Sequence, residues 1–140
     1  MATFNKFNTF VLELAKGTHN LNSNTLKILL TNTAPTASNS LKSDLTEISA
    51  GNGYTAGGNT ATYSSGTQTS GTYKLILSDP ATWTASGGSV GPFRYAVLYN
   101  DTAASKNLIG WWDYGSSVTL ADGEQFVVDL DQVNGVLTLA

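Results

Sequence analysis

Residues 89–101, with the sequence SVGPFRYAVLYND, carry apolar side chains on both faces of a predicted strand. Successive side chains of a strand point to opposite faces. One face of this strand therefore presents Phe93, Tyr95, Val97 and Tyr99, and the other presents Ala96 and Leu98. Because both faces are apolar, both must be covered, either by the rest of the chain or by another protein.

Alternation of apolar and polar residues predicts strands along much of the remaining chain. They lie at residues 25–32, 72–79, 81–85, 92–100, 107–115 and 135–140, and in two arms of 117–132 joined by a turn at 121–123. Leu26, Ile28 and Leu30 are expected to face inward in the first of these strands. Short strands joined by Gly-, Ser- and Asn-rich turns are typical of antiparallel sheets. We therefore predict a mainly β fold, an antiparallel β-sandwich or jelly-roll-like single domain over residues 1–140.

The first seventeen residues predict a short N-terminal α-helix or arm. Phe4, Phe7, Val11 and Leu14 recur at intervals of three and four residues, with Phe10 beside them. Gly17 stands where a C-terminal helix cap belongs. The phenylalanines either pack on the domain's own sheet or anchor the chain on a neighbouring subunit, and the pattern is compatible with both.

Residues 33–70 change character and are rich in Thr, Ala, Ser, Gly and Asn. Leu41, Leu45 and Ile48 are spaced as in a short helical turn, and the glycines that follow are too frequent for a helix. Long connections inside compact domains are usually functional or flexible. We expect this segment to be a long, weakly packed excursion that contacts neighbouring molecules.

The composition favours a surface that is polar but uncharged. Charged residues make up only 12% of the chain and the net charge is −3. Because the basic residues are scattered singly, binding to nucleic acid is not expected. No apolar run approaches the length of a membrane span, and the absence of cysteine excludes disulfides and thiolate metal sites.

Catalytic and metal-binding signals are weak throughout. His19 is the only histidine and lies in a predicted polar turn, without a nucleophile motif around any serine. The glycines of GNGYTAGG miss the dinucleotide-binding spacing, and DLDQVNG at 129–135 departs from the calcium-loop pattern. We therefore expect no enzymatic activity, no cofactor and no metal site. Sugar stacking has slightly more basis, on a platform of Trp83, Trp111, Trp112 and Tyr114, although packing of these rings in a core or an interface is favoured.

Several segments resemble, in the same order, a family of small virion structural proteins of tailed bacteriophages. They are NTLKILLTNTAP, EISAGNGYTAGG, QTSGTYKLILSD, GPFRYAVLYNDT, LIGWWDYGSSVTLADGEQFVVDLD and NGVLTLA, and together they span nearly the whole chain. The resemblance implies a β-rich fold, many copies on a capsid lattice and no enzymatic activity. It favours a capsid decoration, or cement, protein that is assembled in the cytoplasm of the host bacterium and stabilises the head surface. The expected partners are the major capsid protein and further copies of the chain, in a homo-oligomer such as a trimer.

The candidate interface residues are the aromatic residues Phe4, Phe7, Phe10, Tyr54, Trp111 and Trp112. Two other roles stay open: a tail or head–tail connector component, and a small carbohydrate-binding β module of a receptor-binding apparatus. Trp111 and Trp112 point to opposite faces if their strand is extended. A sugar platform needs at least one of these rings exposed beside polar groups, whereas an interface needs rings that become buried on assembly.

Overall fold

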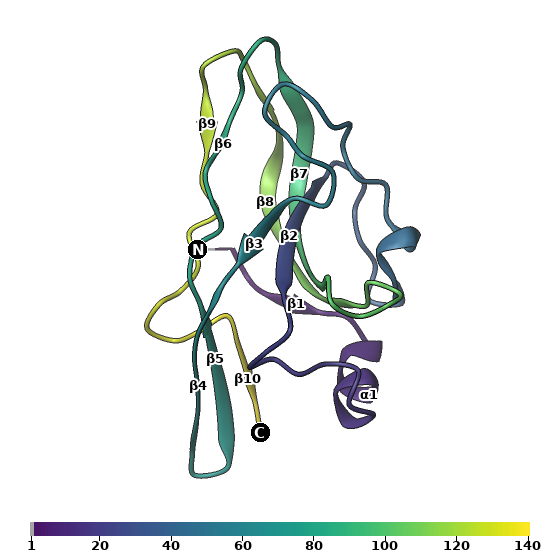
Figure 1. Cartoon of the computed structure of the whole chain (residues 1–140), viewed down its shortest axis with the longest axis vertical. Helices are drawn as coiled ribbons and strands as arrows, with labels where there is room; N and C mark the ends of the chain where they lie inside the picture. Colours follow the sequence, from purple (N-terminus) through teal and green to yellow (C-terminus); the bar gives the residue numbers. More distant parts are fainter. Residues whose placement is uncertain (1) are drawn as a thin grey trace.

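The computed structural model describes residues 2–140 and is mainly β, with antiparallel sheets and one short α-helix, so the predicted fold class is confirmed. The larger sheet is five-stranded, in the order β1 (Asn5–Lys6), β8 (Leu108–Leu120), β7 (Val90–Asn100), β2 (Leu26–Thr31) and β3 (Asn59–Ala61). A three-stranded sheet has the order β10 (Leu137–Leu139), β5 (Thr72–Leu77) and β4 (Tyr63–Thr69), and β6 (Trp83–Thr84) pairs with β9 (Gln125–Phe126). Figure 1 shows the long β7–β8 pair in the upper part of the molecule and the β4–β5 hairpin extending below it.

The main core joins the sheets into a sandwich-like arrangement. It contains Ile28 and Leu98 from the five-stranded sheet, Leu75 and Leu77 from the three-stranded sheet, and Trp83 from β6. All are fully buried or nearly so. Their burial removes apolar surface from water, which is the dominant favourable contribution to folding.

The chain itself covers both faces of β7. Ala96 and Leu98 belong to the main core, while Val97 and Tyr99 join a second buried cluster with Phe7 on the opposite face. The apolar character of both faces is therefore explained within one chain. The predicted face of Phe93, however, is wrong.

Phe93 packs in the main core with Ala96 and Leu98, not with Val97 and Tyr99. The ladder between β7 and β8 shifts register at this point, because Tyr95 pairs with Asp113 whereas Phe93 pairs with Val118. An irregularity of this kind locally breaks the strict alternation of side chains along a strand.

The N-terminal helix is shorter than its spacing predicts. α1 runs only from Thr9 to Ala15, and Asn5–Lys6 form β1 on the edge of β8. The predicted cap at Gly17 is confirmed: its φ is +83°, and the N–H of Thr18 donates to the carbonyl of Glu13 at 2.9 Å. This is the bonding that a left-handed residue after a helix allows.

Residues 33–70 contain secondary structure that their composition does not indicate. β3 and β4 lie within this segment, as does the short 3-10 turn η1 (Lys42–Asp44), which matches the predicted helical turn. Tyr54 is buried, and its hydroxyl donates to Glu47 Oε1 at 2.7 Å and accepts from the N–H of Leu30 at 3.1 Å. The segment is thus tied to β2 by buried polar contacts that composition does not indicate.

After the turn at 121–123, the predicted second arm is only partly a strand. β9 covers Gln125–Phe126, and the chain then continues to β10 without a ladder. Phe126 and Val128 are half-buried and Leu130 is buried, so these three side chains face inward. The N–H of Leu130 donates to Asp79 Oδ1 at 2.8 Å, which holds this irregular segment on the body of the protein.

His19 is not an exposed turn residue, since only 4% of its surface is accessible. Its Nδ1 lies 3.0 Å from Asn100 Nδ2, and its ring lies against Phe10. An amide nitrogen can only donate, so Nδ1 is an acceptor and the imidazole is held neutral. Burial lowers the pKa of His19 below its ordinary value of 6.5, against a smaller opposing effect of Glu13.

We expect the fold to lose stability as the pH falls below about 6.5, because the unfolded chain then takes up a proton at His19 more readily than the folded chain. Above the unfolded pKa this contribution is fully present. Urea unfolding between neutral pH and pH 5 measures it. The variant His19→Asn retains an acceptor for Asn100 but does not titrate, so its stability should vary less with pH. An equal pH dependence in both proteins would contradict this role.

Candidate functional site

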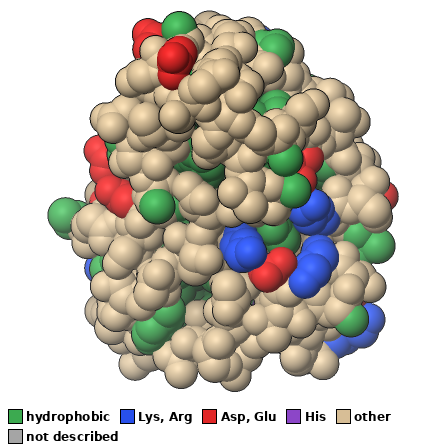
Figure 2. Space-filling model, turned by 45° about the horizontal axis from the view of Figure 1, so that its top comes forward, with side chains coloured by type: hydrophobic (Ala, Val, Ile, Leu, Met, Phe, Trp, Pro, Cys, Tyr) green, Lys and Arg blue, Asp and Glu red, His purple; other side chains and the backbone are tan. Residues whose placement is uncertain are grey.

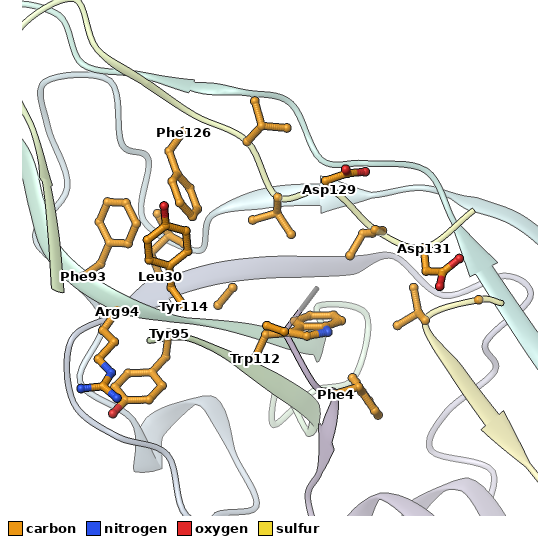
Figure 3. Close-up of a pocket in the computed structure, with 17 residues that line it drawn as sticks. Phe4, Leu30, Phe93, Arg94, Tyr95, Trp112, Tyr114, Phe126, Asp129 and Asp131 are labelled. Carbon is orange, nitrogen blue, oxygen red and sulfur yellow. The ribbon is translucent and has the colours of Figure 1, made fainter. Parts of the chain in front are cut away.

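An open groove of about 590 Å³ lies between the β7–β8 face and the segment of residues 126–136. Its lining includes several aromatic rings, and we call it the aromatic groove. The rings belong to Phe4, Phe93, Tyr95, Trp112, Tyr114 and Phe126. Figure 3 shows Phe93, Tyr114 and Phe126 gathered at one end, and Phe4 and Trp112 at the other.

The alternation of β8 decides which of its rings enter the groove. Trp112 and Tyr114 are two residues apart and share the groove face, whereas Trp111 points to the opposite face. The ring of Phe4 meets Trp112 edge to face at 5.3 Å between centroids. On the other side of the sheet, Phe7 lies 4.6 Å from Trp111. The prediction that the adjacent tryptophans face opposite ways is therefore confirmed.

Phe126 organises the other end of the groove. Its ring contacts Phe93 at 4.8 Å and Tyr114 at 5.5 Å, both edge to face. Aromatic pairs prefer this geometry. Tyr114 nevertheless stays 59% exposed, and Val127 beside Phe126 is 51% exposed. The groove therefore presents apolar surface to solvent rather than a closed core.

Three charged residues also line the aromatic groove, namely Arg94, Asp129 and Asp131. Arg94 forms a two-pronged ion pair with Asp113, at 2.8 and 3.0 Å. The Arg94 guanidinium holds the pKa of Asp113 below its usual range, assisted by the N–H of Gly115. Asp129 and Asp131 come from the opposite wall (Figure 3). The charge of Arg94 is therefore already paired at the groove.

Asp131 has a structural role that accounts for the calcium-loop likeness of its segment. Its carboxylate accepts hydrogen bonds from the N–H groups of Val133 and Asn134, at 2.9 and 2.7 Å. The N–H of Asn134 is the main cause of its lowered pKa. Within residues 2–140, no group of three or more His, Cys, Asp and Glu side chains is placed to hold a metal ion.

The structure divides the six candidate interface residues into three groups. Phe4 and Trp112 line the aromatic groove. Trp111 is half-buried against Phe7 on the far face of the sheet. Phe7, Phe10 and Tyr54 are buried within the chain.

The rings of Phe7, Phe10 and Tyr54 are thus covered by the chain itself, and the role of the six residues in an interface stays a prediction. Phe7 and Phe10 pack on the domain's own sheet, which is one of the two alternatives that the sequence leaves open for the N-terminal phenylalanines. Sequence reasoning missed Phe93 and Phe126 as groove residues. The sequence did offer one signal for this face of the sheet: Trp112 and Tyr114 are two residues apart, and such residues on a strand share a face.

A single platform of Trp83, Trp111, Trp112 and Tyr114 does not form. Trp83 is 1% exposed and lies between Tyr54 and Phe126 in the core. Trp111 faces away from the groove, so only Trp112 and Tyr114 remain together on one surface.

Fold and groove together define a small, mainly β, sandwich-like domain with an open aromatic surface. No protein-family model matches the chain, and neither does any curated protein or solved structure. Among residues 2–140, no helix has the length and apolar character needed to cross a bilayer.

Proposed function

We propose that the protein is a non-enzymatic structural component of a tailed-bacteriophage virion, and that it is a capsid decoration protein that binds and stabilises the assembled head. The segments that resemble small virion proteins span nearly the whole chain and support this class. The observation that carries the proposal is the aromatic groove, whose rings are open to solvent at Tyr114. Exposed apolar surface bordered by polar residues is a common feature of interaction sites.

The proposed groove contact suits a shell surface because its formation costs little desolvation. Burial of aromatic rings is favourable, whereas burial of charges is costly unless they are paired. Only 12% of the residues are charged, and Figure 2 shows a face on which most of the surface is uncharged. Binding should therefore depend little on salt, because few exposed charges are available for screening.

Many copies on one lattice make a modest contact effective. A protein that binds only the assembled shell stabilises that state by mass action, and the contributions of the copies add over the particle. Particles from which the protein is omitted or stripped should resist heat and osmotic shock less well, and purified protein added back should restore that resistance.

The groove can be tested in the same add-back experiment. Tyr114→Ser removes an exposed ring from the groove, and Leu12→Ser removes a comparably exposed side chain from α1, with exposures of 59% and 54%. Only Tyr114→Ser should weaken binding to the shell, by roughly tenfold if one aromatic ring is lost from a contact. Equal binding by both variants would remove the groove from the interface. Particles equally robust without the protein, with no rebinding, would exclude the decoration role, and finding the protein in purified tails would move it there.

A second candidate is a carbohydrate-binding module, favoured by Trp112 and Tyr114 on one open face beside Arg94 and Asp113. Aromatic rings next to polar groups can stack on sugar rings while bonding their hydroxyls. A titration of tryptophan fluorescence with host surface polysaccharide tests this function. Saturable binding that Tyr114→Ser abolishes would favour the module over the decoration protein.

A further inference from the structure

β4 is an open edge of the three-stranded sheet. β5 pairs with it on one side, and no strand within residues 2–140 pairs with the other side. Figure 1 shows β4 as the outer strand of a hairpin that extends away from the β7–β8 pair. Unpaired edges offer a row of free N–H and C=O groups to any other strand.

The turn between β4 and β5 determines which peptide groups of β4 are left unpaired. Ser70 and Gly71 form a two-residue turn with φ of +51° and +85°, and Thr69 pairs with Thr72 beside it. The pair that flanks such a turn is hydrogen-bonded, so alternate residues bond to β5 and the others point outward. Gly66 and Gln68 therefore direct their peptide groups away from β5. Outside the β4–β5 ladder, residues 63–69 make no backbone hydrogen bond with another described residue.

This edge lacks the features that usually prevent pairing. Its sequence, YSSGTQT, contains neither a charge nor a proline, and its one register shift lies at Ser64, which leaves 65–69 regular. Other edges are short or charged: β3 and β10 have three residues each, and the part of β8 beyond β1 carries Asp113. Charges, prolines and short lengths are the common protections of edge strands.

The neighbouring side chains also leave the edge accessible. Lys74 pairs with Thr67 across the hairpin, but its Nζ bonds to the carbonyl of Val133 at 3.0 Å. Val133 precedes β10, which lies on the far side of β5, so this charge is directed away from the β4 edge. The ring of Tyr73 covers Gly66, where a Cβ would meet the Tyr73 hydroxyl at 2.7 Å. That contact compensates for the missing side chain and keeps the strand regular.

We propose that β4 pairs with β4 of a second copy of this chain, antiparallel about a twofold axis at Thr67. Gly66 of each copy then lies opposite Gln68 of the other, and their outward peptide groups bond to one another. Thr67 faces Thr67, and Ser65 faces Thr69, which are pairs of hydroxyl side chains that stabilise antiparallel strands. No like charges oppose each other, so the strand is complementary to itself, as a twofold interface requires.

The proposal does not depend on a role in the virion, because it concerns the isolated protein. Sedimentation of the full chain should show a monomer–dimer equilibrium between about 1 μM and about 1 mM. Thr67→Lys places two ammonium groups opposite each other and should raise the dimer Kd roughly tenfold. Thr138→Lys makes the same exchange at an exposed position on β10 and should leave the Kd unchanged. Mixing Thr67→Lys with Thr67→Glu should restore pairing.

The register can be tested independently because the chain has no cysteine. Residues directly opposite in a pair that is not hydrogen-bonded lie about 4.5 Å apart at Cα, within the range that a disulfide spans. Thr67→Cys should therefore form a covalent dimer on oxidation, and Thr138→Cys should not. Unchanged melting temperatures would establish that the variants fold. A monomer at all concentrations, an oligomer that Thr67→Lys leaves intact, or equal cross-linking of both cysteine variants would overturn the proposal.

Discussion

Replacing Gly58 with alanine should lower the free energy of unfolding by about 3–5 kcal/mol, among the largest effects of a single methyl group on a fold. Gly58 has a φ of +76°, and a Cβ built on it would lie 1.8 Å from the carbonyl oxygen of Ile28 and 2.8 Å from Leu29 Cα. Both atoms belong to the backbone of β2, which cannot move aside without disturbing its pairing with β7. The segment of residues 33–70 therefore lies in direct contact with the backbone of β2 at Gly58.

Gly17→Ala is the matched control for this effect. Gly17 has a similar φ of +83°, but no atom lies within 4 Å of the position of its added Cβ. Its replacement should cost only the left-handed conformation, about 1–2 kcal/mol. Urea unfolding of the two variants separates the steric contribution from the conformational one. Similar losses in both would show that residues 57–59 do not approach β2 as closely as described.

The second large effect is expected from Glu47→Ala, which should destabilise the fold by about 2–4 kcal/mol. Glu47 Oε1 accepts hydrogen bonds from the hydroxyl of Tyr54 at 2.7 Å and from the N–H of Gly57 at 2.5 Å. Its Oε2 pairs with Lys42 at 3.0 Å. Because Tyr54 is buried, alanine would leave its hydroxyl without its acceptor and would release the excursion from β2.

Glu47→Gln separates the hydrogen bonds from the charge. Glutamine retains an oxygen for Tyr54 and Gly57 and loses only the ion pair with Lys42, so its cost should be about 1 kcal/mol or less. Hydrogen exchange at Gly57 and Gly58 should be slow in the native protein and in Glu47→Gln, and faster in Glu47→Ala. Fast exchange at these amides in the native protein would instead support the weakly packed excursion that the composition predicts.

The sequence by itself determined the features that depend on local rules. The antiparallel β class and most strand positions followed from alternation, since a half-buried strand repeats every two residues. The opposite directions of Trp111 and Trp112 followed from the same period. The left-handed cap at Gly17 followed from the conformational freedom of glycine after a helix. Each of these features depends on neighbours only a few positions along the chain.

Only the tertiary structure decided which aromatic residues are accessible. Phe7, Phe10 and Tyr54 looked like Phe4 and Trp112 in the sequence, yet the first three are buried and the last two line the aromatic groove. The difference arises from pairings between distant segments, such as β1 with β8 and Tyr54 with Glu47 and Leu30. The composition of the chain does not indicate such pairings.

Pairing between distant segments also explains the position of Phe93 and the structure of residues 33–70. The register shift that places Phe93 in the main core depends on where β8 returns beside β7, and the arrangement of residues 54–61 depends on polar contacts with β2 and with Glu47. A pattern of apolar and polar positions shows that a face must be covered, but not by which part of the chain. Coverage is set by long-range packing, in which one buried hydrogen bond or one close backbone approach outweighs local preference.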